Sequence, residues 1–349
     1  MKTIYISHFP GEIKEGGSAR NFAFYSYFRQ KEHIRIFNIF RTNKLLRLYT
    51  TMCLTLLLYF VSGHRIFIHQ GTLLYLYPKL ILKYSIGRRF YKSILTHIVK
   101  KNMLILEIND LPYEQAIDLE LPVYIEYLYF ENIIFSIKKI NFIFAANEMC
   151  EYASSKYNIN IKKTKVIING ASSLTVTSGV NVSINKDKIN FVYAGTLNKG
   201  RQIEKLITLF RELNNKNLIL LGANGEWINS LNLPPNILYL GNYNESVAHW
   251  MVSQCDVGII PYDSSKLYYN ICFPTKVSFY LTANIPVLST PLSELMQYHK
   301  EFIFFSEWDN WSDFVDSIKR EDILYKKEFI KNNNFKYEWE NLLKKELDE

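Results

Sequence analysis

Residues 237–290, ILYLGNYNESVAHWMVSQCDVGIIPYDSSKLYYNICFPTKVSFYLTANIPVLST, decide the fold. Their apolar spacing predicts a strand that ends at Gly241, a helix over Ser246–Ser253, a strand over Val257–Pro261, a helix over Thr275–Thr282 and a strand over Pro286–Ser289. Short apolar runs that alternate with helices are typical of parallel strands joined by helical crossovers. We therefore expect an open α/β sheet here.

The same alternation continues outward in both directions. In the second half it predicts strands over 189–193, 218–221 and 237–240, a helix over 203–213 and a final helix over 337–347. In the first half it predicts strands over 3–7, 34–39, 65–69, 103–107, 142–145 and 166–168, with helices over 19–31, 44–59, 73–97 and 148–156. A Ser/Thr/Val-rich stretch from residue 171 onward separates the two halves and indicates a linker.

Two Rossmann-like domains with parallel sheets facing a central cleft are the expected architecture. The predicted N-terminal domain is 1–172, the linker 173–188 and the C-terminal domain 189–330, and a helix in 331–349 is expected to pack back toward the first domain.

Composition excludes several classes of protein. Hydrophobic residues make up 48% of the 349 residues, which is incompatible with a disordered chain. The four cysteines contain no C-x-x-C pair and the seven histidines show no metal-ligand spacing, so neither a disulfide scaffold nor a zinc site is expected. No two aspartates are spaced D-x-D, and a metal-independent mechanism is therefore expected.

Charge is concentrated in the first third of the chain. Residues 1–101 hold 17 Lys and Arg against three Glu and no Asp, a balance of +14, whereas the remainder carries −6. This asymmetry indicates an anionic membrane surface or a nucleic acid as partner, or else a solvated basic face. No aromatic–basic recognition module is present, so nucleic acid is not expected.

One apolar stretch raises the question of a membrane span. Leu48–Val61 is fourteen residues long, and a spanning helix needs about 20. It is therefore predicted to be a buried or interfacial helix. The N-terminus reads as a buried strand and a turn, and no signal peptide is expected.

A second motif with chemical meaning precedes the opening stretch. YAGTLNKGRQIEKLI, Tyr193–Ile207, places Gly195, Lys199 and Arg201 between a strand and a helix. Glycines and cations at such a turn favour phosphate, because backbone N–H groups and the helix dipole attract an anion there. Any turn of this kind also carries a lysine by chance, so the motif alone leaves both interpretations open.

Taken together these motifs resemble the C-terminal domain of bacterial GT-B glycosyltransferases, especially glycosyltransferase family 4 and its divergent surface-polysaccharide relatives. The resemblance rests on YAGTLNKGR, on Asn169-Gly170 at the domain boundary, and on Asp256-Val-Gly-Ile-Ile-Pro261, Pro274-Thr-Lys276 and Ala283-Asn-Ile-Pro286-Val287. In the first domain, Gly16-Gly17 resembles the glycine loop of the family.

The resemblance implies a nucleotide-sugar donor on the second domain, expected to be a UDP-sugar rather than a GDP-sugar, and no other cofactor. Lys276 in the first turn of a helix, with Arg201 or Lys199, would then bind the diphosphate; otherwise Lys276 is an exposed lysine. The implied donor site comprises Gly16, Gly17, Gly195, Lys199, Arg201, Tyr269, Asn270, Pro274, Thr275 and Lys276. Tyr268, Tyr269 and Asn270 are alternatively residues of a surface loop.

The sequence departs from the family at two glutamates. The corresponding positions are Ile271 and Phe279, and the usual glycine of the Ala-x-Gly element is Asn284. The carboxylate contacts to sugar and ribose are therefore replaced, and the resemblance does not fix retaining or inverting stereochemistry.

The base of an inverting reaction is expected at a strand end of the first domain, because ligands of open α/β sheets bind beyond the carboxyl ends of strands. Asp110 is the first candidate, and Glu107 and His69 are further ones. Asp110 has the alternative role of capping the turn before Pro112, and His69 that of a structural residue.

The predicted activity is transfer of a sugar to a glycan acceptor, lipid-linked, in capsule, O-antigen or exopolysaccharide synthesis at the cytoplasmic face of the membrane. The alternatives are an inactive GT-B partner subunit, motivated by the two missing glutamates, and a GT-B sugar-nucleotide epimerase.

Overall fold

A computed structural model describes residues 1–11, 16–77, 79–173, 184–198 and 201–348. The chain forms two compact units: unit 1 comprises Met1–Ile168 with Leu343–Glu349, and unit 2 comprises Asn169–Leu342. The division falls earlier in the chain than the predicted boundary at residue 172, and residues 174–183 of the predicted linker lie outside the described residues.

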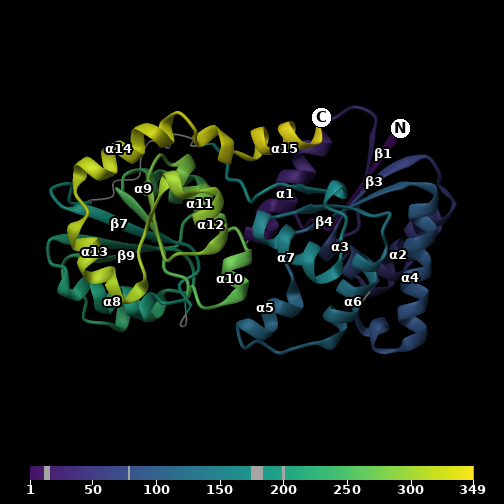
Figure 1. Ribbon diagram of the computed structural model, residues 1–349, viewed down its shortest axis with the longest axis horizontal. Helices are drawn as coiled ribbons and strands as arrows, with labels where there is room; N and C mark the ends of the chain where they lie inside the picture. Colours follow the sequence, from purple (N-terminus) through teal and green to yellow (C-terminus); the bar gives the residue numbers. More distant parts are fainter. Residues whose placement is uncertain (12–15, 78, 174–183, 199–200, 349) are drawn as a thin grey trace. The chain divides into compact units, whose positions relative to one another are not determined.

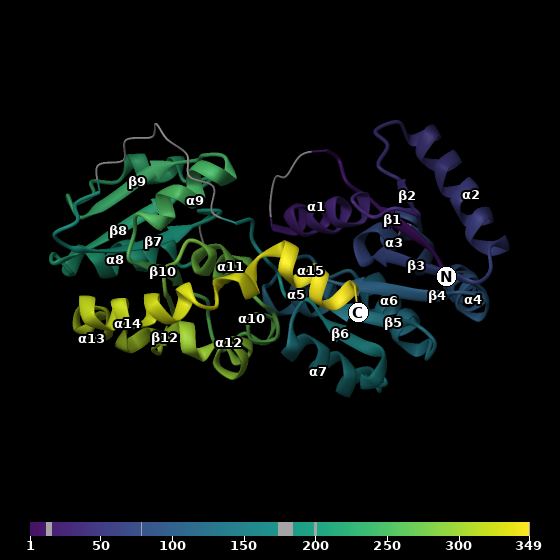
Figure 2. The same ribbon diagram turned by 90° about the horizontal axis from the view of Figure 1, so that it is seen from above.

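Unit 1 is built on a six-stranded parallel sheet in the order β2-β1-β3-β4-β5-β6 (Figure 1). Helices cover both faces; α1 and α7 lie on opposite sides of the sheet in Figure 2. The strands are β1 (Lys2–Ser7), β2 (Ile34–Asn38), β3 (His64–His69), β4 (Met103–Ile108), β5 (Asn141–Phe144) and β6 (Thr164–Val166). The helices are α1 (Gly16–Arg29), α2 (Lys44–Phe60), α3 (Gln70–Leu76), α4 (Ser85–Lys101), α5 (Pro112–Asp118), α6 (Ile125–Ser136) and α7 (Asn147–Tyr157), with 3-10 turns η1 (Lys79–Lys83) and η2 (Ile161–Lys163).

Unit 2 has a second six-stranded parallel sheet, in the order β12-β11-β10-β7-β8-β9. Every residue of β7 and β8 is buried, as expected for parallel strands covered on both faces. The strands are β7 (Ile189–Ala194), β8 (Lys216–Leu221), β9 (Ile237–Gly241), β10 (Val257–Ile260), β11 (Val287–Ser289) and β12 (Ile303–Phe305). The helices are α8 (Ile203–Glu212), α9 (Glu245–Ser253), α10 (Leu267–Ile271), α11 (Thr275–Thr282), α12 (Ser293–Tyr298), α13 (Trp311–Ser317), α14 (Arg320–Lys331) and α15 (Trp339–Leu347), with 3-10 turns η3 (Glu226–Ser230), η4 (Lys300–Phe302), η5 (Trp308–Asn310) and η6 (Asn334–Tyr337).

The predicted fold class, α/β with two parallel sheets, is confirmed. The predictions of single elements were incomplete. The expected helix over 73–97 is divided into α3, η1 and α4, consistent with Pro78 in the sequence, because proline cannot donate the hydrogen bond of a helix interior. Strand β12 and helices α5, α6, α10, α12, α13 and α14 were not predicted. In α6 the apolar residues are not confined to one side, so helical periodicity is weak.

Each sheet reverses its direction of growth once. In unit 1 the chain passes from β1 to β2 on one side and then to β3 on the other side of β1. In unit 2 it passes from β7 through β8 and β9 and then to β10 on the other side of β7. Such topological switch points open a crevice between diverging loops at the carboxyl ends of the strands, where open α/β sheets bind ligands.

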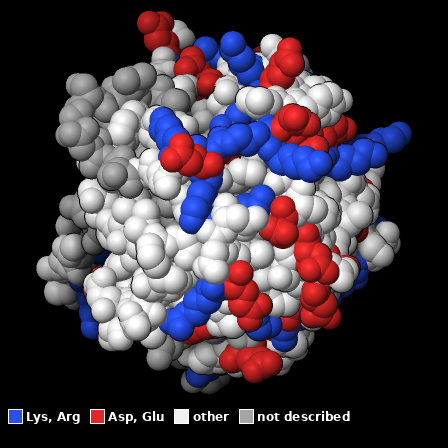
Figure 3. Space-filling model, turned by 90° about the vertical axis from the view of Figure 1, so that its left-hand side faces the viewer, with Lys and Arg blue, Asp and Glu red and all other residues white. Residues whose placement is uncertain are grey.

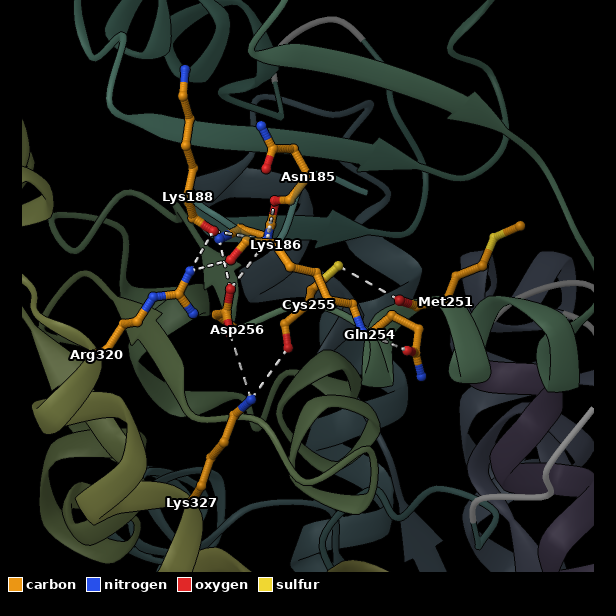
Figure 4. Close-up of polar contacts among 10 residues, drawn as sticks. Asn185, Lys186, Lys188, Met251, Gln254, Cys255, Asp256, Arg320 and Lys327 are labelled. Carbon is orange, nitrogen blue, oxygen red and sulfur yellow. Dashed lines mark hydrogen bonds and ion pairs between the residues drawn. The ribbon is translucent and has the colours of Figure 1, made fainter. Parts of the chain in front are cut away.

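Asp256 fixes the opposite end of β10 (Figure 4). Its carboxylate accepts hydrogen bonds from the backbone and side-chain amides of Asn190, at 2.9 and 3.2 Å, and lies 3.8 Å from the Lys327 ammonium. Strands β7 and β10 are thereby joined to helix α14 at their amino ends. Asp256 therefore anchors the strand that precedes Tyr262, a residue of the site described below.

The C-terminal helix ends on unit 1. The Asp348 carboxylate accepts a hydrogen bond from the Tyr27 hydroxyl and forms an ion pair with Lys31 at 2.7 Å. Lys165 donates to the carbonyl of Glu346 at 2.7 Å. The last residues are thus tied to α1 and to the region of β6.

Two buried carboxyl groups face each other between α5 and α6 of unit 1. Glu131 is fully buried and accepts a hydrogen bond from the Tyr157 hydroxyl at 2.7 Å. Glu114 pairs with Lys156. Burial and the adjacent Glu114 carboxylate raise the pKa of Glu131 to about 8. At neutral pH Glu131 therefore holds a proton that the unfolded chain would release.

This proton makes stability pH-dependent. Since the folded-state pKa of Glu131 lies above its unfolded value, the free energy of unfolding should fall as pH rises from about 5 to 8, by up to about 1.4 kcal/mol per pH unit. Glu131→Gln cannot ionise and should lose that slope, which chemical unfolding between pH 5.5 and 8.5 measures. Glu151→Gln, at an exposed position of α7, is the control. Equal slopes in both variants would contradict this account.

Candidate active site

The first turn of α11 carries Lys276 at the switch point of the unit 2 sheet. The side chain is half-buried and its ammonium donates to the Tyr262 hydroxyl at 3.0 Å. The Nζ atom also lies 5.1 Å from the ring centre of Tyr193, the penultimate residue of β7. Lys276 thus reaches back from α11 to the carboxyl ends of the two strands that flank the switch point.

Arg201 joins the same cluster. Its side chain lies near the hydroxyl of Tyr262 and those of Tyr193 and Tyr269. Among the described residues, no ion pair links Lys276 or Arg201 to a carboxylate. Two cations at this edge of the sheet therefore have phenol hydroxyls as partners and keep their positive charge uncancelled.

The tyrosine at the centre of the cluster responds to this charge. Burial alone would raise the pKa of Tyr262, but the Lys276 and Arg201 cations lower it overall. Burial would lower the pKa of Lys276, and the surrounding tyrosine oxygens raise it instead. Lys276 is therefore protonated at any physiological pH.

Gly195 makes room for Lys276. Its φ of +140° belongs to the region that favours glycine, and a Cβ atom there would lie 2.5 Å from Cε of Lys276. Gly222, at the end of the neighbouring strand, packs against the Gly195 carbonyl, which a Cβ would meet at 1.9 Å. Both glycines are required by close approach at the switch point.

Helix α11 is held by residues of the loop before it. The Asn169 amide donates to the Phe273 carbonyl at 3.1 Å, and the Ser278 hydroxyl donates to the Asn169 carbonyl at 2.5 Å. Pro274, the N-cap residue, supplies no side-chain hydrogen bond, so Pro274 and Thr275 leave the first-turn N–H groups of α11 without a side-chain cap. Hydrogen bonds to Asn169 thus hold the turn before α11, and the start of the helix has no side-chain cap.

The predicted loop residues divide into two groups. Tyr269 stacks on Tyr262 with 4.6 Å between ring centres and so belongs to the cluster, and Tyr268 contacts Tyr269. Asn270 instead donates to the Ser264 and Lys266 carbonyls and accepts from Ser293. Its amide is thus used to fix the loop.

Three residues of the predicted donor site remain. Lys199 is outside the described residues. Gly16 and Gly17 are the first two residues of α1, in unit 1. The structure therefore brings together Gly195, Arg201, Tyr269, Pro274, Thr275 and Lys276 of the predicted donor site.

Tyr193 and Tyr262 were missed as site residues. The signal was available: each stands at or just after the end of a predicted strand, and the two strands are neighbours in the sheet. A tyrosine at such a position has its ring in the core and its hydroxyl at the sheet edge.

The strand ends of unit 1 carry a different polar cluster. Glu107 on β4 is buried and forms an ion pair with Arg20 of α1, which is 1% exposed and also donates to the Ile167 carbonyl at 2.8 Å. His69, opposite Glu107 on β3, has its Nε2 atom 3.9 Å from that carboxylate. Protonating Glu107 would leave Arg20 uncompensated in the interior, which is costly.

The protonation of His69 is set by its neighbours. The Nδ1 atom accepts a hydrogen bond from the Gly71 N–H at 3.0 Å, so the neutral ring carries its proton on Nε2, toward Glu107. Burial lowers the pKa of His69. With Nδ1 used as an acceptor and Nε2 carrying the proton, the neutral ring is poorly placed to accept another.

Asp110 is the least buried of the three candidate bases. It is half-buried, and its carboxylate accepts a hydrogen bond from the Leu111 N–H at 3.1 Å. The N-cap of α5 is Leu111, without a side-chain cap, so Asp110 does not occupy the capping position. Of the three, it is the carboxylate with access to solvent.

Two features are missing from the described part of the chain. No group of three or more His, Cys, Asp or Glu there is arranged to hold a metal ion. No helix within those residues is long and apolar enough to cross a membrane.

No protein-family model matches this chain, and no curated protein matches it in sequence. Its structure, however, is similar to those of GT-B glycosyltransferases over nearly the whole chain, and the fold is therefore GT-B.

The similar structures include Anabaena Alr3699/HepE in complex with UDP and glucose, with a TM-score of 0.64, 12% identity, and 99% of this chain and 98% of that chain covered. A glycosyltransferase from Rickettsia africae ESF-5 has a TM-score of 0.61 and 13% sequence identity, and the match covers 99% of this chain and 97% of that one. WaaG, a glycosyltransferase involved in lipopolysaccharide biosynthesis, has a TM-score of 0.56 and 10% sequence identity, and the match covers 95% of this chain and 93% of that one.

The contact between Gly195 and Lys276 is testable through stability. Gly195→Ala adds a strained φ and displaces the lysine, whereas Gly241→Ala, at φ +86° with open space around it, adds only the strain. We expect both to destabilise by about 1–2 kcal/mol for the backbone, and Gly195→Ala by more.

A double-mutant cycle isolates the clash. Adding Lys276→Ala should relieve the excess cost of Gly195→Ala, with a coupling energy of about 0.5–3 kcal/mol in denaturant unfolding, and should leave the cost of Gly241→Ala unchanged. Additive effects in both pairs would show that Lys276 does not occupy this space.

Proposed function

We propose that the protein is a glycosyltransferase that moves a sugar from a nucleotide-diphosphate donor to a glycan acceptor. The observation that carries the proposal is the pair of cations, Lys276 and Arg201, that face tyrosine hydroxyls at a switch point. A half-buried cation that has no carboxylate partner favours an anionic ligand, and the first turn of α11, which has no side-chain cap, adds N–H donors for phosphate.

In the proposed reaction, the bond between the anomeric carbon and the diphosphate oxygen breaks while an acceptor hydroxyl bonds to that carbon. The leaving nucleoside diphosphate gains negative charge, which Lys276 and Arg201 stabilise. Charge-stabilising groups of this kind replace a metal ion in the proposal, and no further cofactor is required. The acceptor proton passes to Asp110 if the reaction inverts the anomeric centre.

The similar structures support the choice of donor and pathway. HepE has been crystallised with UDP-glucose, which favours a UDP-sugar. WaaG acts in lipopolysaccharide biosynthesis and WaaB is a lipopolysaccharide outer core galactosyltransferase, which supports a role in surface polysaccharide synthesis. A lipid-linked acceptor and a place at the inner face of the cell membrane are the proposed setting.

Donor binding is tested by thermal shift. A nucleotide at 100 times its dissociation constant should stabilise the fold by about 2.7 kcal/mol. Lys276→Ala should remove most of the shift given by UDP and UDP-sugars and lower turnover by about 10²–10³. Lys300→Ala, an exposed lysine of the same unit, should match wild type. Wild-type affinity and turnover in Lys276→Ala would refute the donor site.

The base is tested separately. Asp110→Asn keeps the shape of the side chain and removes its capacity to accept a proton, so turnover should fall by about 10²–10⁴ while the thermal shift with UDP is retained. Surviving turnover, together with a product of retained configuration, would exclude Asp110 as base. Hydrolysis of the donor without acceptor distinguishes an enzyme from an inactive partner subunit.

A further inference from the structure

Helix α2 of unit 1 is apolar on both of its faces. Leu54 and Leu58 are buried against the unit, as in any amphipathic helix. The opposite stripe is also apolar, and its side chains are 56–78% exposed: Leu45, Leu48, Tyr49, Met52, Leu56 and Phe60. Their spacing of three and four residues places them on one side of the helix. An outward stripe of this size requires a cover, because soluble surfaces seldom expose contiguous apolar area.

The stripe continues onto the adjoining segment. Helix α4 packs beside α2 (Figures 1 and 2). The Tyr59 and His97 rings stack with 3.8 Å between their centres. In η1 and α4, further apolar side chains are 57–77% exposed: Leu80, Tyr84, Ile86 and Phe90. The two helices therefore present one apolar surface.

Cations border this apolar surface. Between Glu32 and Glu107 the chain has twelve Lys and Arg and no Asp or Glu. A groove of about 370 Å³ runs along α4 and is lined by Arg89, Lys92, Ser93, Thr96, His97 and Lys100. By contrast, the face near α13 drawn in Figure 3 carries both signs of charge side by side. The α2–α4 surface is thus apolar and cationic at once.

We propose that α2, η1 and α4 form a docking surface for an anionic lipid bilayer. Helix α2 would lie in the plane of the interface with its outer stripe among the acyl chains, and the groove on α4 would take lipid phosphate. The inference deepens the proposed function and rests on it for the lipid-linked acceptor. Its own observations are the exposed stripe and the charge around it.

The two features together select a bilayer over other occupants. Apolar side chains beside cations match the boundary between acyl chains and anionic headgroups. A nucleic acid would satisfy the cations and leave the apolar stripe exposed to water. A second copy of the chain would cover the stripe and bring two cationic surfaces together.

The lipid-facing cations are those free to point outward. Arg88 is not one of them, because its guanidinium donates to the Leu82 and Lys83 carbonyls at 2.9 and 3.0 Å and lies over Tyr129. Arg89, Lys92 and Lys100 are exposed and line the groove. Neutralising these three therefore removes charge without disturbing the internal contacts of Arg88.

Cys53 provides a native probe of docking. It is an exposed cysteine in the middle of α2, whereas Cys272 in unit 2 is half-buried. Alkylation of the two thiols in the full-length protein is followed by mass spectrometry, with vesicles of phosphatidylcholine alone or with 30 mol% phosphatidylglycerol. Phosphatidylglycerol vesicles should slow the alkylation of Cys53 at least tenfold and leave Cys272 unaffected. Equal rates with and without these vesicles would overturn the proposal.

Two sets of variants separate the contributions. Replacing Arg89, Lys92 and Lys100 by Gln should weaken vesicle binding on the order of a hundredfold, at roughly fivefold for each cation. Met52→Gln with Leu56→Gln should weaken it about tenfold or more at any salt concentration. The control for the cations replaces three other exposed lysines, Lys138, Lys139 and Lys162, by Gln. The control for the apolar residues is Leu324→Gln with Tyr325→Gln, which are also exposed. Binding that survives in both test sets would also overturn it.

The thermal shift with UDP is measured on the same variants. If vesicle binding is lost and the UDP shift is retained, the docking surface is confirmed independently of the donor site. If wild type binds vesicles through this surface and shows no UDP shift, the proposed transferase is wrong and the docking surface stands. Retention on DNA with no protection of Cys53 would assign the surface to nucleic acid and refute the bilayer.

Discussion

The site in unit 2 depends on one interaction, the contact of two half-buried cations, Lys276 and Arg201, with tyrosine hydroxyls in place of carboxylates. A carboxylate beside Lys276 would satisfy the ammonium but also cancel the charge that an anionic ligand needs. The Tyr262 hydroxyl gives Lys276 a hydrogen bond and leaves its charge available. Gly195 and Gly222 allow the strands and α11 to approach closely enough for this contact. The tyrosines are therefore as much a part of the site as the cations.

The two positions where the resemblance expects glutamates serve the packing of unit 2. Ile271, at the first of them, is buried at the end of α10, and the Phe279 ring lies against that of His249. Both side chains belong to the packing of the helices around the site. A carboxylate within ion-pair distance of Lys276 or Arg201 would reduce the charge that these cations offer to an anionic ligand.

The sequence was informative where chemistry is local. The strand–helix alternation and the Pro274–Lys276 element predicted both sheets and the position of Lys276, because a turn and a first helical residue are adjacent in the chain. It was uninformative where the partner is distant: Arg20 and Glu107 are 87 residues apart, and no pattern links them. The environment of helix α2 was ambiguous for another reason. An apolar helix has the same sequence pattern whether its outer stripe is covered by protein or exposed.

The two units surround their inner cations in opposite ways. In unit 1, Arg20 is compensated by Glu107, so the pair is a scaffold that orients β3, β4 and α1 and has no charge left for a ligand. In unit 2, Lys276 and Arg201 contact tyrosine hydroxyls, and their positive charge stays available to a ligand. Because a buried ion pair is costly to break and an uncompensated cation gains by binding an anion, an anionic ligand would gain more from Lys276 and Arg201 than from Arg20. Asp110, beyond the carboxyl end of β4, differs from Glu107 in being half-buried and not tied to Arg20.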